Sequence, residues 1–144
     1  MRKADDHDVA DARYLRLIDA NVNRCREGLR VIEDTARFVL GNAALYRRLR
    51  ALRHGVDKAT RGIYPQMIAH RNSVSDAGRA LKEFKRDSIR AVASANFRRV
   101  EESLRVLEEY TRLLIPGSGA VFKEIRYKVY HYEKQLMDMF KPGG

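Results

Sequence analysis

The sequence predicts an all-α protein, and three observations lead to that fold class. Glycine and proline are scarce, with 9 and 3 among 144 residues. The stretches between them are rich in Ala, Leu, Arg, Glu and Lys, which are strong helix formers. Apolar residues recur with the 3.6-residue period of a half-buried helix, whereas the strict alternation of a strand is absent. The length suits one domain with one core.

The first predicted helix runs from about Ala12 to Leu40, a stretch without proline. At about 100° per residue, counted from Asn21, one arc about 100° wide collects the apolar side chains. These are Val22, Cys25, Leu29, Ile32, Ala36, Val39 and Leu40. We interpret Cys25 as a small core residue. Gly41-Asn42 predicts the end of this helix.

The remaining elements follow from apolar periodicity and from turn residues. A second helix is expected from about Ala43 to Arg61, and a short helix with a loop within 62–79. Ser88 is expected to cap a long helix that reaches Ile115, and Pro116 to Gly119 end it. A last helix covers about 120–140. Residues 1–11 are expected to fray, and residues 141–144 form a tail.

The chain contains an internal repeat. The segments that begin at Asn21 and Asn96, 75 residues apart, share the pattern N-x-x-R-x-x-E-x-L-R-V-[IL]-E-[DE]-x-x-R. After a one-residue insertion the similarity continues more weakly. We therefore predict a duplicated helical hairpin that forms a four-helix bundle, in a single domain over 12–140. Repeat one covers about 12–61, a helix/loop insert 62–87, and repeat two about 88–140.

Half of the repeated polar residues are interpreted as a solvated face with ion pairs one helical turn apart. The pairs are Arg30–Asp34 and Glu33–Arg37 in repeat one, and Arg105–Glu109 and Glu108–Arg112 in repeat two.

The repeated asparagines, Asn21 and Asn96, favour another role, because asparagine is a poor residue inside a helix. Each borders the apolar arc, and an arginine and a glutamate follow at i+3 and i+6: Arg24 and Glu27, then Arg99 and Glu102. One interpretation is a buried polar network that joins the hairpins. The other is a ligand cleft, with arginines for phosphate and acids for a metal or for proton transfer. Both stay open at this point.

The net charge of +10 attracts nucleic acid, anionic membranes or phosphorylated small molecules. One cysteine excludes a disulfide framework, and no apolar run approaches about 20 residues, so we expect a cytoplasmic protein. Acids interleave with the repeated arginines and interrupt a continuous basic stripe, which argues against nucleic acid as a partner. Neither a Walker motif nor a G-x-G-x-x-G motif occurs.

Two further groups of residues are candidates for phosphate binding. Arg53-His54 lies in a markedly basic second helix, although the basic face alone is compatible with simple solvation. The segment from His70 to Arg79 offers hydroxyls, Asp76, Gly78 and Arg71. It could wrap phosphates or could be a polar connector.

The segment Leu17 to Asp34, with Ala36-Arg37-Phe38, Leu52-Arg53-His54, the Asp76-x-Gly78 loop and Ala95 to Tyr110, resembles a known family. That family is the helical, non-ribokinase, ThiD-like hydroxymethylpyrimidine phosphate kinases. Its members are usually fused to the N-terminal side of thiamine-phosphate synthase. Two departures from the pattern are Asn72, where an acid is expected, and Ala77, where valine is expected.

The resemblance implies phosphorylation of 4-amino-5-hydroxymethyl-2-methylpyrimidine phosphate by ATP, with Mg²⁺, in thiamin biosynthesis. Phosphoryl transfer between two anionic ligands needs arginines and a metal. Catalysis and magnesium are assigned to Glu27, Glu102 and Asp76. Ligand and phosphate binding are assigned to Asn21, Arg24, Arg53, His54, Arg71, Asn96 and Arg99.

Two other functions stay open. One is a non-catalytic ligand-binding or interaction domain that accompanies thiamine-phosphate synthase. The other is a basic module for nucleic acid. A homodimer is compatible with the apolar arcs.

Overall fold

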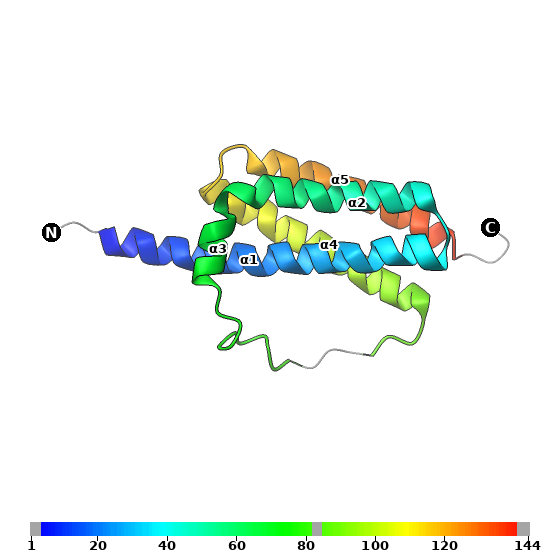
Figure 1. Cartoon of the computed structure of the whole chain (residues 1–144), viewed down its shortest axis with the longest axis horizontal. Helices are drawn as coiled ribbons and strands as arrows, with labels where there is room; N and C mark the ends of the chain where they lie inside the picture. The colour runs from blue at the N-terminus through cyan, green and yellow to red at the C-terminus, as the bar shows by residue number, and fades with distance from the viewer. Residues whose placement is uncertain (1–3, 82–84, 141–144) are drawn as a thin grey trace.

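The computed structural model describes residues 4–81 and 85–140, and the described part is helical, with no strand. For residues 4–11 only the backbone is described. The predicted tail, 141–144, lies outside the described residues. Four long helices pack as a bundle, which confirms the predicted fold class (Figure 1). None of the helices in this part is long and apolar enough to cross a membrane.

The first hairpin pairs α1, Ala4–Asp34, with α2, Ala43–Thr60. α1 starts at Ala4 rather than near residue 12. It continues as a π-helical turn, Thr35–Val39, in which the Leu40 amide donates to the Thr35 carbonyl at 3.0 Å. Gly41 has a φ of +62°, and the Asn42 side chain caps α2 by accepting from the Leu45 amide at 3.0 Å. The turn predicted at Gly41-Asn42 is therefore confirmed.

The second hairpin repeats this arrangement with α4, Ile89–Tyr110, and α5, Ser118–Asp138. The Ser88 hydroxyl accepts from the Ala91 amide at 3.0 Å, so the predicted cap is confirmed. A short 3₁₀ turn, Thr111–Leu113, follows α4, and Gly117, with a φ of +78°, precedes α5. Between the hairpins, a 3₁₀ turn at Arg61–Ile63 leads into α3, Tyr64–His70, which crosses one end of the bundle (Figure 1).

The hairpins join through α1 and α4, which make the most extensive contact in the bundle. Gly28 marks a close approach of the two helices. A Cβ at Gly28 would lie 2.7 Å from the Val100 Cγ2 and 3.2 Å from the Asn96 carbonyl oxygen. The core along this contact includes Ile18, Leu29 and Phe97, all fully buried. A small residue on the edge of the apolar arc thus lets the second backbone approach.

The prediction that Glu33 and Glu108 face the solvent is wrong. Both are buried, with 0% and 2% of their surface exposed. Glu33 receives two hydrogen bonds from Arg53, and Glu108 receives two from Arg126. The predicted pairs Arg30–Asp34 and Arg105–Glu109 form between exposed side chains, at 3.6 and 3.1 Å. The predicted pair Glu108–Arg112 also forms, at 3.3 Å, although its carboxylate is buried.

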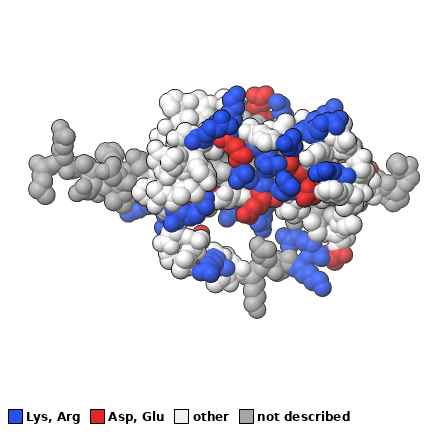
Figure 2. Space-filling view, viewed as in Figure 1, with Lys and Arg blue, Asp and Glu red and all other residues white. Residues whose placement is uncertain are grey.

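Acidic and basic side chains alternate over the face that α1 and α2 present (Figure 2). Part of the basic surplus on that face is therefore neutralised by neighbouring carboxylates, such as Asp57 beside Arg26 at 2.8 Å.

Candidate ligand-binding site

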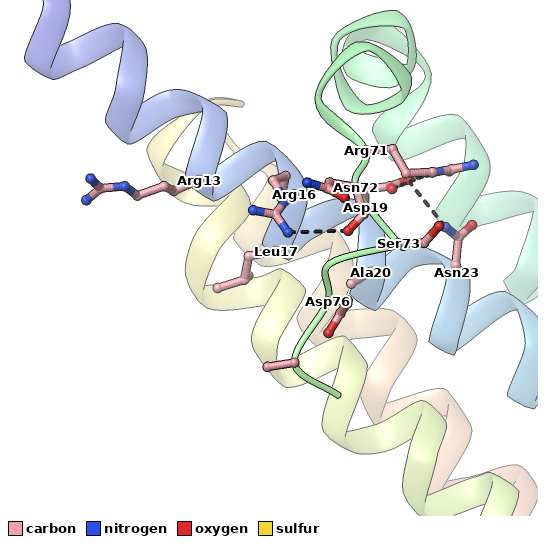
Figure 3. Close-up of a pocket in the computed structure, with 11 residues that line it drawn as sticks. Arg13, Arg16, Leu17, Asp19, Ala20, Asn23, Arg71, Asn72, Ser73 and Asp76 are labelled. Atoms are coloured by element: carbon pink, nitrogen blue, oxygen red, sulfur yellow. Dashed lines mark hydrogen bonds and ion pairs between the residues drawn. The ribbon is translucent and has the colours of Figure 1, made fainter. Parts of the chain in front are cut away.

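A pocket of about 380 Å³ lies between α1 and the segment that follows α3. α3 turns the chain across the end of the bundle, and residues 71–77 then return along α1. Figure 3 shows Asp19 and Asn23 of α1 close to this segment, whereas the Arg13 side chain extends away from it. The lining residues are Arg13, Arg16, Leu17, Asp19, Ala20, Asn23, Arg71, Asn72, Ser73, Asp76 and Ala77.

An ion pair between Asp19 and Arg71 fixes the returning segment to α1. The Arg71 Nε and Nη2 donate to the two carboxylate oxygens of Asp19 at 2.7 and 2.6 Å. Asn23 adds a hydrogen bond from Nδ2 to the Asp19 Oδ1 at 3.3 Å. The hydrogen bonds to Asp19 raise the pKa of Arg71, so the guanidinium stays charged. Asp19 is only 5% exposed, and the Arg71 guanidinium neutralises its charge at the edge of the pocket.

The returning segment is shaped by its own short polar side chains. The Asn72 Oδ1 accepts from the Ser75 amide at 3.2 Å, and the Asp76 Oδ1 accepts from the Gly78 amide at 2.8 Å. Such side-chain-to-backbone bonds stabilise tight turns. The Asn72 side chain therefore organises the loop through its bond to Ser75. In addition, Arg16 of α1 donates to the Asn72 backbone carbonyl at 3.4 Å.

The pocket has a surplus of positive charge. Arg71 and Asp19 neutralise one another, which leaves Arg13 and Arg16 against the single carboxylate of Asp76. Arginine presents a planar fork of donors that matches phosphate and carboxylate oxygens. The arrangement can therefore hold an anionic group beside α1.

The repeated asparagines are used inside their own helices. The Asn21 Nδ2 donates to the Leu17 carbonyl at 2.9 Å, and its Oδ1 accepts from the Arg24 Nη1 at 3.2 Å. The Asn96 Nδ2 donates to the Val92 carbonyl at 2.8 Å. Both amides thus have structural partners, and neither asparagine lines the pocket.

The other predicted binding residues are dispersed. Arg53 is engaged by Glu33, as described above, and His54 is exposed on α2. Arg99 is half-buried on α4. Of the predicted phosphate ligands, the structure places Arg71 in the pocket, together with the predicted acid Asp76.

The predicted magnesium ligands come from three different elements. Glu27 is exposed on α1, Glu102 is exposed on α4, and Asp76 lies in the loop. Within residues 4–81 and 85–140, no group of three or more His, Cys, Asp or Glu side chains is arranged to hold a metal ion. The structure therefore does not bring Glu27, Glu102 and Asp76 together into one group.

Four polar residues that line the pocket were not predicted as site residues: Arg13, Arg16, Asp19 and Asn23. Asp19 carried a signal, because it is an acid between the apolar residues Ile18 and Ala20. Its partner is 52 positions away, and local spacing cannot show such a contact.

The fold defines a helical-bundle domain, and a pocket with an excess of arginine lies beside its first helix. The chain matches the model of the ThiD2 family over residues 16–135 and belongs to that family.

Curated relatives share substantial identity with this chain. A thiamine-phosphate synthase of Nostoc punctiforme is 45% identical over 125 residues, which are 85% of this chain and 35% of the relative. A thiamine-phosphate synthase of Synechocystis is 42% identical over 125 residues, 85% of this chain and 36% of the relative. The chain thus spans about a third of the curated relatives that it matches. No solved structure matches it significantly.

The predicted ATP-dependent kinase activity is contradicted by these comparisons. The relatives are named thiamine-phosphate synthase, and none of the names reported above is that of a kinase. The link to thiamine biosynthesis is supported, and so is the interpretation of the chain as a domain that accompanies the synthase. Binding of ATP and of magnesium stays a prediction.

Proposed function

We propose that this chain is the helical domain that accompanies thiamine-phosphate synthase, and that it binds a phosphorylated pyrimidine in the pocket between α1 and residues 71–77. Family membership supports the first part, because the chain matches about a third of each synthase. The name of these relatives refers to a phosphorylated compound. The pocket supports the second part.

One observation carries the proposal: Asp19 holds Arg71 in place while Arg16 of α1 contacts the same loop. A guanidinium that is fixed before the ligand arrives loses little entropy on binding. Arg71 uses Nε and Nη2 for Asp19, which leaves Nη1 for a ligand. The Ser73 hydroxyl lines the same pocket and can donate to a phosphate oxygen.

The pocket forms only when α3 turns the chain back across α1. The ligand therefore contacts both a bundle helix and the insert. Binding stabilises the folded state, in which the two are joined.

Calorimetric titration of the folded protein tests this proposal. The probe is 4-amino-5-hydroxymethyl-2-methylpyrimidine phosphate, titrated into wild type, Arg16→Ala and Arg47→Ala. Arg47 is an exposed arginine of α2 outside the pocket, so its variant carries the same change of net charge. We expect Arg16→Ala to weaken binding about tenfold, as for the loss of one charged hydrogen-bonding group, and Arg47→Ala to leave it unchanged.

Equal affinity of Arg16→Ala and wild type would place the ligand elsewhere. Absence of binding to the folded wild-type protein would refute the proposal as a whole.

A further inference from the structure

A groove runs between α2 and α5, the second helices of the two hairpins. These helices lie side by side in the bundle but contact one another less than α1 and α4 do (Figure 1). The groove has a volume of about 540 Å³ and shares no residue with the candidate ligand pocket. It is therefore a separate feature of the protein surface.

Small side chains of α2 keep the groove open. Three of them line it at every fourth position: Ala51, Gly55 and Ala59. Leu52 of α2 and Ile125 of α5, each 7% exposed, form the apolar floor. A Cβ at Gly55 would meet only the Ile125 Cδ1, at 3.5 Å, so the described chain leaves room beside this glycine.

The shape of the groove suits a helix. Val121 lies at one end of the lining stretch of α5, with 43% of its surface exposed, and the half-buried Tyr132 lies at the other end. Between these two residues α5 rises about 16 Å, and residues 48–59 cover the same length of α2. An apolar groove of about three helical turns can accept the apolar face of an amphipathic helix.

The rim of the groove is basic. Arg48, Lys58 and Lys128 are exposed there, and Glu124 is the one carboxylate among the lining residues. Glu124 pairs with Lys128 at 3.3 Å. Arg48 and Lys58 form no ion pair within the described part of the chain. Uncompensated cations beside an apolar floor complement acidic side chains that flank an apolar stripe.

Other occupants suit this surface less well. A second copy of the chain would bring the same cations to the contact, and like charges repel one another. Nucleic acid would use the cations through its phosphates but would leave the apolar floor without a partner. A lipid surface takes up apolar side chains that protrude, whereas Leu52 and Ile125 are recessed.

We propose that the groove between α2 and α5 binds an acidic amphipathic helix of a partner protein. The apolar face of that helix packs on Leu52, Gly55 and Ile125. Its flanking carboxylates lie beside Arg48 and Lys58. This contact leaves the candidate ligand pocket uncovered, because the two features have no residue in common.

Peptide binding, measured by fluorescence anisotropy, tests the proposal. The probe is a labelled synthetic peptide of about four helical turns, with leucines on one face and glutamates on the others. One control peptide has the same composition in scrambled order, and a second has lysine in place of each glutamate. We expect the acidic amphipathic peptide to bind the wild-type protein about tenfold more tightly than either control.

Substitutions in the groove locate the binding site. Gly55→Leu fills the groove and should weaken binding about tenfold, whereas Gly55→Ala adds an ordinary contact and should bind as wild type does. The double variant Lys58→Glu/Lys128→Glu should weaken binding about tenfold or more. Its matched control is Arg47→Glu/Lys134→Glu, which changes the net charge equally at exposed positions of the same helices outside the groove. This control should keep nearly the wild-type affinity.

Thermal unfolding of each variant verifies that it is folded. If Gly55→Leu proves unstable, the charge-reversal variant and its control decide the test. The methyl signals of Leu52, Val121 and Ile125 in nuclear magnetic resonance spectra should shift when the acidic peptide is added.

Three results would overturn the proposal. The first is equal binding of the amphipathic and scrambled peptides, or no binding of either by the folded wild-type protein. The second is wild-type affinity in the folded groove variants. The third is a dimer of the chain that Gly55→Leu dissociates, because the groove would then belong to a second copy.

Discussion

Arg53 donates two hydrogen bonds to the buried carboxylate of Glu33, from Nε at 2.7 Å and from Nη2 at 3.0 Å. In the second hairpin, Arg126 contacts the equivalent Glu108 through Nε at 3.1 Å and Nη2 at 3.0 Å. The two arginines are not equivalent in sequence, because Arg126 corresponds to Arg50, about one helical turn before Arg53. In each hairpin an arginine of the second helix thus neutralises the equivalent buried glutamate, but the two arginines come from different turns of that helix.

Loss of the Arg53 side chain should therefore be far more harmful than loss of Arg50. Arg53→Ala leaves the Glu33 carboxylate buried without a cation, which costs about 3–5 kcal/mol. Arg50 is exposed, and Arg50→Ala should change the free energy of unfolding by less than about 0.5 kcal/mol. Urea unfolding at pH 7 measures both. Glu33→Gln, added to Arg53→Ala, should recover part of the loss, and equal losses in the two single variants would contradict the prediction.

A methyl group should have opposite effects at two helical glycines. Gly28→Ala brings a Cβ to 2.7 Å from the Val100 Cγ2 and 3.2 Å from the Asn96 carbonyl, so α1 and α4 must separate or repack. We expect a loss of about 1–3 kcal/mol. At Gly55, the added Cβ meets only the Ile125 Cδ1, at 3.5 Å, which is an ordinary contact.

Gly55→Ala is therefore the matched control for the substitution in α1. Alanine favours a helix over glycine by about 0.5–1 kcal/mol, so this variant should be more stable than wild type. Thermal unfolding compares the two. A stable Gly28→Ala variant would mean that the α1–α4 contact is looser than it is in the structure.

Glu101 makes the stability of the protein depend on pH. Burial, followed by the charge of Glu133, raises the pKa of Glu101 from its ordinary value of 4.5 to about 8. Between these two values the folded state keeps a proton that the unfolded state releases, so stability falls as pH rises through this window. Glu101→Gln removes the effect and should raise the melting temperature relative to wild type, most clearly above pH 8.

Melting temperatures between pH 4 and pH 9 test this dependence. The two proteins should converge near pH 4, where the carboxyl group is protonated in both states. Each kcal/mol corresponds to about 3–4 °C in a domain of this size. The neighbouring Glu102 is exposed, so Glu102→Gln should follow the wild-type profile. A constant difference between Glu101→Gln and wild type at all pH values would argue against the titration.

Cys25 should be unreactive in the folded protein. Its side chain is fully buried, and burial raises the pKa of the thiol to about 12. The thiolate is the reactive form, so an aromatic disulfide reagent at pH 8 should release no chromophore from the native chain. In denaturant, one equivalent per chain should react. Rapid labelling of the native protein would show that the α1–α4 core opens readily.

The regular elements could be predicted because each follows from local chemistry. The apolar period marks the helices, and Ser88 and Asn42 are side chains that cap a helix start. The burial of Glu33 could not be predicted in this way. At about 100° per residue, Glu33 lies only just beyond the apolar arc of α1, and the docking of α2 decides whether that position is covered.

The candidate site illustrates the same limit. Arg71 and Asp76 could be selected from sequence because they occur in a polar loop, but the spacing along α1 pointed to Asn21 and Arg24 rather than to Asp19. An Asn side chain can bond to the carbonyl four residues before it, and both repeated asparagines do so. A polar residue that recurs in a repeat can therefore form a hydrogen bond within its own helix without contributing to a site. The Asp19–Arg71 contact, in contrast, depends on the tertiary path of the insert.

The way in which the hairpins meet has a consequence for the order of folding. Within each hairpin a short turn brings the two helices together, whereas the α1–α4 contact at Gly28 and Val100 joins residues more than 70 positions apart. Closing so long a loop costs more chain entropy than closing a turn. We therefore expect the two hairpins to appear first, as separately nucleated units. Their docking would set the overall folding rate, and a longer insert would slow that step while leaving hairpin formation unchanged.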